Sequence, residues 1–165
     1  MYRVGILNVS YRGARGERED RSGPALAEVM GLLPGARVEA RAIVPDEQPL
    51  IEEALRQWVA DGLDLVLTTG GTGMSPRDVT PEATRAVIVR EAPGFAEAMR
   101  AASLALTPHA MLSRAVAGIA GCTLIINLPG SPKAARENLM TILPALHHAL
   151  DKLKGDPSEC ATPDS

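Results

Sequence analysis

Three glycines within four residues follow an apolar segment near the middle of the chain. The stretch reads LTTGGTGMSPRDVTPEAT over residues 67–84, with Gly70, Gly71 and Gly73 in its first half. Glycines expose backbone N–H groups and let a bulky anion approach without a Cβ in the way. The helix expected to begin at Thr80 adds further free N–H groups. The loop therefore predicts a phosphate site, although a turn that needs glycine only for its backbone geometry explains it equally well.

Neither of the two common phosphate-binding motifs fits this loop. A Walker loop ends in Gly-Lys-Ser/Thr, which the stretch lacks, and the dinucleotide fingerprint needs a third glycine where Pro76 stands. The loop must therefore be interpreted together with the other polar segments of the chain.

Asp46 and Asp78 each lie shortly after the end of an expected strand. Two carboxylates near a phosphate repel it unless a cation lies between them, and Mg²⁺ is commonly held by one or two carboxylates plus substrate phosphates. Taken singly, Asp46 is explained as a helix N-cap and Asp78 as an Asx-turn residue. Beside the glycine loop, we favour a site in which Asp46 and Asp78 are both metal ligands and catalytic residues.

Two more segments carry polar groups that suit a ligand. Residues 127–133 read NLPGSPK and lead into the last expected helix, so they form either an anion site or an ordinary strand-to-helix turn. Ser103, Ser113 and Arg114 flank an irregular stretch, and hydroxyls with an arginine suit a polar heterocycle or a second phosphate. No serine–histidine–aspartate triad is readable.

Apolar segments alternate with segments of helical spacing along the chain. We expect strands over residues 2–10, 36–44, 65–69, 115–119 and 122–127, and helices over residues 24–33 (capped by Ser22), 50–60, 80–90 (capped by Thr80), 95–106 and 134–154. Residues 11–21 are expected to form a mobile charged loop. The alternation predicts an α/β fold, a three-layer α/β/α sandwich with a mostly parallel central sheet. Its ligands should lie beyond the carboxyl ends of the strands, where Val44, Thr69 and Asn127 precede loops.

Composition excludes several classes of partner. The 165 residues suit one domain over residues 1–154, with residues 155–165 as a disordered tail. A net charge of −3 and 2% aromatic residues argue against nucleic-acid binding. No apolar run is long enough to span a membrane and no signal peptide is recognisable, so we expect a cytoplasmic protein. Two cysteines are too few for a disulfide framework, and we expect Cys122 in the core and Cys160 in the tail.

The assembled segments resemble the molybdopterin adenylyltransferase family, which includes the bacterial enzymes and the G domains of gephyrin and its plant counterpart. The segments that carry the resemblance are EDRSGPAL (19–26), IVPDE (43–47), the glycine loop, MLSRAVAGI (111–119) and TLIINLPGSPKA (123–134). The resemblance implies an enzyme that uses ATP, molybdopterin and Mg²⁺ to form adenylylated molybdopterin and pyrophosphate. It also implies a homotrimer.

The resemblance also implies roles for individual residues. The family's two functionally important aspartates fall on Asp46 and Asp78, and relatives usually have Ser-Asp where this chain has Ser10-Tyr11. The residues expected to bind the nucleotide are Thr69, Gly70, Gly71, Thr72, Gly73, Asn127, Pro129, Gly130 and Ser131. The residues expected to bind molybdopterin are Glu82, Ser103, Ser113 and Arg114.

Two other functions compete with this interpretation. One is a non-catalytic relative that binds molybdopterin, and the other is a nucleotide pyrophosphatase of the competence-damage type, which has a similar TGG loop. The presence of both Asp46 and Asp78 favours catalysis. The stretches LSRAVAG and NLPGSPKA favour the adenylyltransferase over the pyrophosphatase.

Overall fold

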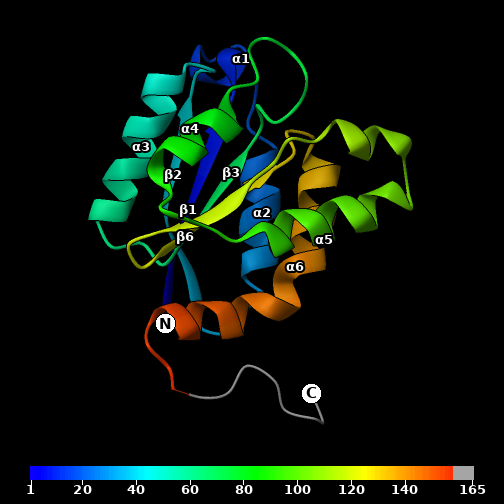
Figure 1. The fold of residues 1–165 in the computed structure, drawn as a ribbon. Coiled ribbons are helices and arrows are strands. Elements are labelled where there is room, and N and C mark those ends of the chain that lie inside the picture. Colours follow the sequence, from blue (N-terminus) through cyan, green and yellow to red (C-terminus); the bar gives the residue numbers. More distant parts are fainter. Residues whose placement is uncertain (158–165) are drawn as a thin grey trace.

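The computed structural model describes residues 1–157, and its centre is one six-stranded sheet in the order β2-β1-β3-β6-β5-β4 (Figure 1). The parallel strands are β1 (Tyr2–Val9), β2 (Ala36–Val44), β3 (Leu65–Thr69) and β6 (Thr123–Leu128). The antiparallel strands are β4 (Arg90–Glu91) and β5 (Ala117–Ala120). The mostly parallel sheet predicted from the sequence is confirmed.

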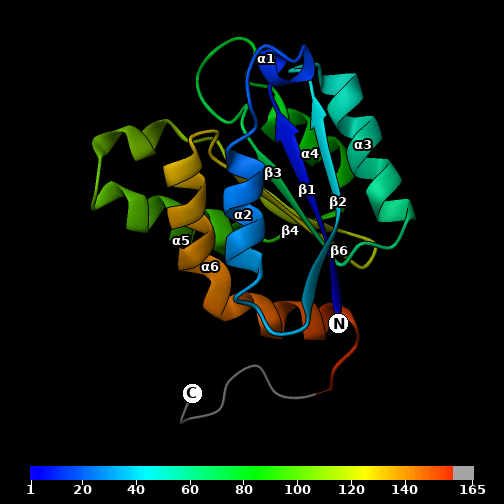
Figure 2. The same ribbon diagram turned by 180° about the vertical axis from the view of Figure 1, so that it is seen from behind.

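Helices cover both faces of this sheet, as Figures 1 and 2 show from opposite sides. One face packs against α2 (Ser22–Met30), α5 (Pro93–Leu104) and α6 (Pro132–Leu153). The other packs against α3 (Gln48–Ala60) and α4 (Thr80–Val87). Two short elements complete the structure, α1 (Tyr11–Ala14) and the 3₁₀ helix η1 (Pro108–Leu112). The three-layer α/β/α arrangement is therefore confirmed.

The burial of the strands follows from their place in the sheet. Every residue of β3 and β6 is buried, because these central strands have helices on both faces; apart from Asn127, their residues are apolar or carry a hydroxyl. β2 is an edge strand, and its residues alternate between half-buried and exposed. Within residues 1–157, no helix is both long and apolar enough to cross a bilayer.

The parallel strands end level with one another. Asn8 pairs with Thr69, Thr69 pairs with Leu128, and Val9 pairs with Val44. The loops that follow these strands consequently meet at one edge of the sheet, around α1 in Figure 1. This confirms the expectation for the loops after Val44, Thr69 and Asn127.

Two hydroxyls expected to cap helices are used differently. Ser22 donates its hydroxyl to the Gly130 carbonyl at 2.8 Å, and Thr80 donates to the Gly70 carbonyl at 2.9 Å. Each hydroxyl thus ties a helix start to a neighbouring loop. The residues before them, Arg21 and Val79, occupy the N-cap positions without a capping side chain.

Three other local expectations were wrong. Residues 11–21 are not all loop, because Ser10 caps α1 by accepting from the Gly13 N–H at 3.0 Å. The expected helix over 80–90 stops at Val87, since the following chain pairs with β5 through the Val89 N–H and the Ile119 carbonyl. Cys122 is exposed in the turn between β5 and β6. Cys160 and most of the expected disordered tail lie outside the described residues.

Candidate active site

The glycine loop has a backbone that only glycine adopts readily. Gly70 and Gly71 have φ angles of 97° and 69°, and added Cβ atoms would lie 2.4 Å from the Val9 carbonyl oxygen and 2.2 Å from Thr80 Oγ1. Backbone geometry therefore requires these glycines. In the described part of the chain, the N–H groups of Gly71, Thr72 and Gly73 have no hydrogen-bond acceptor. Free donors in such a loop suit an anion, so the two explanations are compatible.

Two cavities adjoin the carboxyl edge of the sheet, and the same two loops contribute to both. The larger cavity, about 1080 Å³, is lined by Gly70, Gly71, Gly130 and Ser131 together with residues that follow β1 and β2. The smaller cavity, about 270 Å³, is lined by the next residues of the glycine loop, Thr72 and Gly73, together with Pro129 and parts of α5, η1 and α6. The two loops thus form a partition between the cavities.

The expected ligand-binding residues are divided between these cavities, but not by expected ligand, because Thr72, Gly73 and Pro129 of the nucleotide set line the smaller one. The larger cavity contains Asp46, Gly70, Gly71, Gly130 and Ser131, and the smaller contains Thr72, Gly73, Ser103, Ser113 and Pro129. Asp78, Thr69, Asn127, Glu82 and Arg114 line neither.

Asp46 and Asp78 are close enough to influence one another. Burial raises the pKa of the half-buried Asp46 carboxyl above its ordinary value, and the negative charge of Asp78 raises it further. Two effects oppose them: the Tyr11 N–H donates to Asp46 Oδ2 at 2.8 Å, and Arg77 contributes a positive charge. Asp78 Oδ2 accepts from the Ser75 N–H at 2.9 Å. The pair is a concentration of negative charge at the edge of the larger cavity.

Arg114 holds the glycine loop in place through hydrogen bonds to its backbone carbonyls. Its guanidinium donates to the carbonyls of Gly73 and Asp78, at 2.8 and 2.6 Å, and to the carboxylate of Glu82. Burial is the largest influence on the pKa of Glu82 and raises it, but the hydrogen bond from Arg114, a backbone hydrogen bond and the charges of Arg114 and Arg85 together outweigh it, so the net shift is downward. Arg114 and Glu82 thus bond to each other, and Arg114 also bonds to the loop; neither residue lines a cavity.

Asn127 and Thr69 also act inside the protein. Asn127 is fully buried; its Oδ1 accepts from the Val116 N–H and its Nδ2 donates to the hydroxyls of Thr68 and Thr84. Thr69 is equally buried and donates to the Pro129 carbonyl at 2.7 Å. These side chains position the two loops relative to one another.

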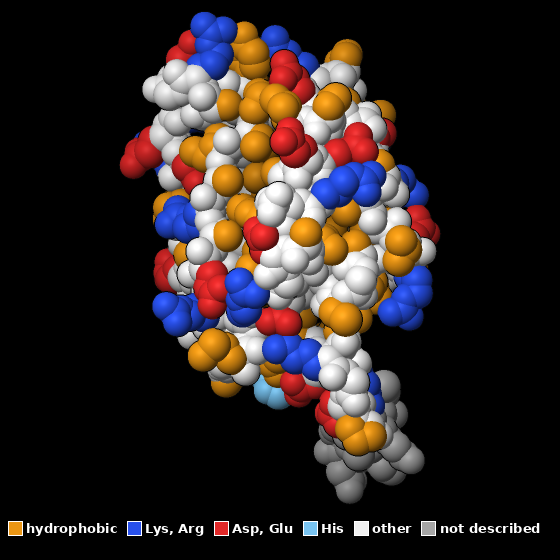
Figure 3. All heavy atoms as spheres, turned by 90° about the vertical axis from the view of Figure 1, so that its left-hand side faces the viewer, with side chains coloured by type: hydrophobic (Ala, Val, Ile, Leu, Met, Phe, Trp, Pro, Cys, Tyr) orange, Lys and Arg blue, Asp and Glu red, His pale blue; other side chains and the backbone are white. Residues whose placement is uncertain are grey.

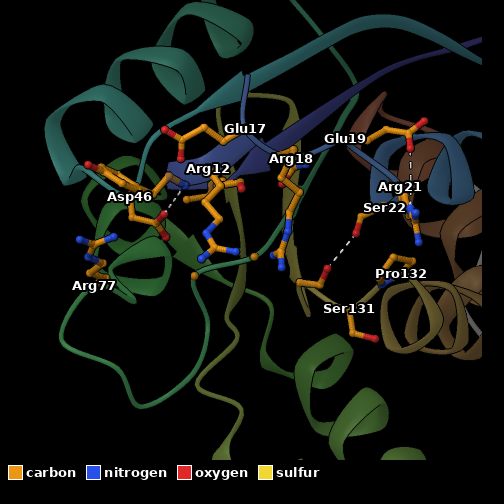
Figure 4. A pocket seen from close by; sticks show the side chains of 17 residues that line it. Arg12, Glu17, Arg18, Glu19, Arg21, Ser22, Asp46, Arg77, Ser131 and Pro132 are labelled. Carbon is orange, nitrogen blue, oxygen red and sulfur yellow. Dashed lines mark hydrogen bonds and ion pairs between the residues drawn. The ribbon is translucent and has the colours of Figure 1, made fainter. Parts of the chain in front are cut away.

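Sequence reasoning missed several cavity residues. The larger cavity is also lined by Arg12 and Arg18, whose side chains point into it in Figure 4. The smaller cavity is also lined by Arg100 and Asn138, which come from α5 and α6. The charged run over residues 11–21 was a signal for the arginines. Nothing in the sequence brings Asn138, far along the chain, next to Ser103, to whose hydroxyl it donates at 2.8 Å.

The fold and this site define a class: an α/β protein with a ligand site at the carboxyl edge of its parallel strands. Residues 5–148 match the MoCF_biosynth family, described as a probable molybdopterin binding domain, and the chain belongs to this family.

Similar proteins are found among both curated sequences and solved structures. The chain is 45% identical to the molybdopterin adenylyltransferase of Helicobacter pylori strain J99, over 93% of this chain and 88% of the relative. It is also 45% identical to gephyrin of Dictyostelium discoideum, over 93% of this chain but only 23% of that longer protein. The crystal structure of the molybdopterin biosynthesis enzyme MoaB from Thermus thermophilus is 56% identical, covers 96% of this chain and 100% of that one, and has a TM-score of 0.88.

Proposed function

We propose that this protein is a molybdopterin adenylyltransferase, which converts ATP and molybdopterin into adenylylated molybdopterin and pyrophosphate. The observation that carries the proposal is the partition described above. The partition separates two adjoining cavities, a large one with the free Gly71 N–H group and charged side chains and a small one with hydroxyls and apolar walls. A reaction that joins two dissimilar substrates needs such a pair of neighbouring sites.

In this proposal the nucleotide occupies the larger cavity. The free N–H group of Gly71 and the hydroxyl and backbone of Ser131 bind its phosphates. Molybdopterin occupies the smaller cavity, with Ser103 and Ser113 within reach of its polar atoms. Its phosphate oxygen attacks the α-phosphorus of ATP across the partition, a new P–O bond forms, and the bond to the departing pyrophosphate breaks. Positioning of the two phosphates and neutralisation of their charge supply most of the catalysis.

Asp46 and Asp78 suit a magnesium ion. The negative charge of Asp78 raises the pKa of the Asp46 carboxyl more than the positive charge of Arg77 lowers it, and carboxylate oxygens are ligands that Mg²⁺ prefers. Among residues 1–157 no cluster of three or more His, Cys, Asp or Glu side chains could hold a metal alone. Two carboxylates with substrate phosphates as the other ligands fit this arrangement. Bound there, Mg²⁺ would offset the repulsion between the reacting phosphates.

An assay of the purified protein tests the proposal directly. ATP, Mg²⁺ and molybdopterin should yield adenylylated molybdopterin and pyrophosphate in equal amounts, and chelation by EDTA should abolish both products. A protein that binds molybdopterin without forming either product would instead be the non-catalytic relative. Release of AMP from ADP-ribose would indicate the pyrophosphatase.

We also propose that the protein acts as a homotrimer in the cytoplasm, as the family resemblance implies. Support for the assembly comes from α5 and η1, which extend to one side of the sheet in Figure 1. Four large apolar side chains are exposed there: Leu104, Leu106, Met111 and Leu112. Light scattering should give three times the monomer mass, and a stable monomer would contradict this part of the proposal.

A further inference from the structure

The larger cavity is lined by arginines to which the proposed function has so far given no role. Four arginines line it: Arg12, Arg18, Arg21 and Arg77. Two of them have partners, because Arg21 lies 3.8 Å from a Glu19 carboxylate oxygen and Arg77 stacks 4.3 Å above the centre of the Tyr11 ring. Arg12 and Arg18 make no side-chain hydrogen bond or ion pair with any residue that the structure describes. Their charges face an open polar cavity.

The acidic side chains of the same cavity do not cancel these two arginines. Glu19 pairs with Arg21, and Glu17 pairs with Arg15 at 3.0 Å. Asp46 accepts from the Tyr11 N–H. Both glutamates therefore have an arginine partner, and Asp46 forms no ion pair with Arg12 or Arg18 in the described part of the chain, so two guanidinium groups remain for a ligand.

Figure 4 shows how the two side chains lie. Both point from the segment after β1 into the cavity, Arg12 on the side of Asp46 and Arg18 on the side of Ser22 and Ser131. Their backbone is ordered by local hydrogen bonds, from the Gly13 N–H to Ser10 Oγ at 3.0 Å and from the Glu17 N–H to the Arg12 carbonyl at 2.9 Å. The backbone of this segment is therefore held in place by hydrogen bonds, whereas the two guanidinium groups have no partner among the described residues.

The chemistry of these groups selects the ligand. A guanidinium presents parallel N–H donors that match phosphate oxygens and stays charged at every physiological pH. Two of them near the free N–H group of Gly71 suit an anion with several adjacent charges, such as a pyrophosphate group. The adenosine and α-phosphate portion of a nucleotide carries too little charge to require both.

We propose that Arg12 and Arg18 bind the β- and γ-phosphates of ATP and hold the pyrophosphate as it leaves. The inference rests on the proposed function and assigns residues to one part of its substrate. When the bond between the α-phosphorus and the bridging oxygen breaks, the electron pair passes to that oxygen, and the two guanidinium groups stabilise the added negative charge.

Calorimetric titration with inorganic pyrophosphate and with AMP tests this assignment. In Arg12→Gln/Arg18→Gln, pyrophosphate should bind about 100-fold more weakly, or about tenfold per arginine, because charge-assisted hydrogen bonds are lost. AMP should bind within about threefold of the wild-type affinity. The variant Arg12→Lys/Arg18→Lys, which keeps the charges but not the planar fork, should fall between.

Arg37→Gln/Arg90→Gln is the matched control, because it removes the same charge from β2 and β4 at residues that do not line the cavity. This control should bind pyrophosphate as the wild type does, and all variants should melt at the wild-type temperature. Equal weakening in the control, or unchanged pyrophosphate binding in Arg12→Gln/Arg18→Gln, would overturn the arginine assignment and leave the proposed function standing. A wild-type protein that binds neither AMP nor pyrophosphate would overturn both.

Discussion

The two cavities beside the glycine loop differ in the kind of group that forms them. The larger is built from backbone and charge: glycines, a Ser131 turn, four arginines and Asp46. The smaller is built from short polar side chains and apolar contacts, with Ser103, Ser113 and Asn138 set among Leu106, Leu112 and Pro129. The first suits a polyanion and the second suits a flat heterocycle. The glycine loop and the loop after β6 can therefore contact two substrates, because neighbouring residues of each loop line different cavities.

The face of the molecule that carries α3 does not repeat this concentration of positive charge (Figure 3). Figure 3 shows the side of the molecule that carries α3, where Lys and Arg side chains are interspersed with Asp and Glu. A mixed surface of this kind does not attract a long polyanion, whereas a local cluster attracts a small one. The electrostatics thus agree with a small phosphorylated ligand.

The largest expected effect is on the rate of adenylylation in the larger cavity, while binding of molybdopterin in the smaller cavity stays unchanged. Asp46→Asn and Asp78→Asn should each reduce adenylylation by about 10³-fold, because the metal that offsets phosphate repulsion loses a ligand. Affinity for molybdopterin should stay near wild type. Asp61→Asn is the control. Asp61 is the exposed C-cap residue of α3, and its carboxylate accepts a hydrogen bond from the Gln57 side chain of the same helix. Near-normal turnover with lowered stability would mean that both aspartates only support turns.

A second test changes the partition itself. Gly70→Ala should lower the free energy of unfolding by about 2–3 kcal/mol, because alanine is strained at a φ of 97° and its Cβ would meet the Val9 carbonyl. Gly94→Ala, in α5 with no atom near the added Cβ, should be neutral or slightly stabilising. Chemical denaturation of both variants measures the difference, and equal effects would refute the proposed strain.

A third variant weakens the hydrogen bonds by which Arg114 holds the glycine loop in place. Arg114→Lys keeps the charge but loses the fork that bonds the Gly73 and Asp78 carbonyls and Glu82. We expect kcat to fall about 10–100-fold through displacement of the loop, with smaller changes in both KM values. The control is Arg85→Lys, whose ion pair with Glu91 is exposed. A rise confined to the KM for molybdopterin would show instead that Arg114 contacts that substrate.

The smallest effect concerns the smaller cavity alone. Ser113→Ala should raise the KM for molybdopterin about 3–10-fold through the loss of one hydrogen bond, while the KM for ATP stays unchanged. Ser75→Ala, in the glycine loop but lining neither cavity, should change neither value. A change in the KM for ATP would contradict the separation of the two sites.

Much of the fold followed from the sequence because its signals are local. The bounds of β2 and β3 agree with the predicted strands to the residue, since β2 lies between Gly35 and Pro45 and β3 lies between Asp64 and Gly70. The loops over residues 45–47, 70–79 and 129–131 could also be placed at one edge, because parallel strands share their carboxyl ends.

The details of the site depended on contacts between distant residues. Arg114 could be recognised as a cation in a polar stretch, but only the tertiary structure places it against Gly73 and Asp78. The sequence suggests that Asn127 binds a ligand, but its side chain is buried and its amide donates to hydroxyls on β3 and α4. Ser22 likewise satisfies the helix-cap pattern while bonding Gly130, 108 residues away. Local patterns cannot distinguish a side chain that binds a ligand from one that holds two loops together.

A crystal structure with a non-hydrolysable ATP analogue and Mg²⁺ tests the division between the cavities most directly. We expect the triphosphate over Gly70 and Gly71 in the larger cavity, the metal between it and the carboxylates of Asp46 and Asp78, and an empty smaller cavity. The nucleotide in the smaller cavity, or its phosphates bound away from both aspartates, would contradict it.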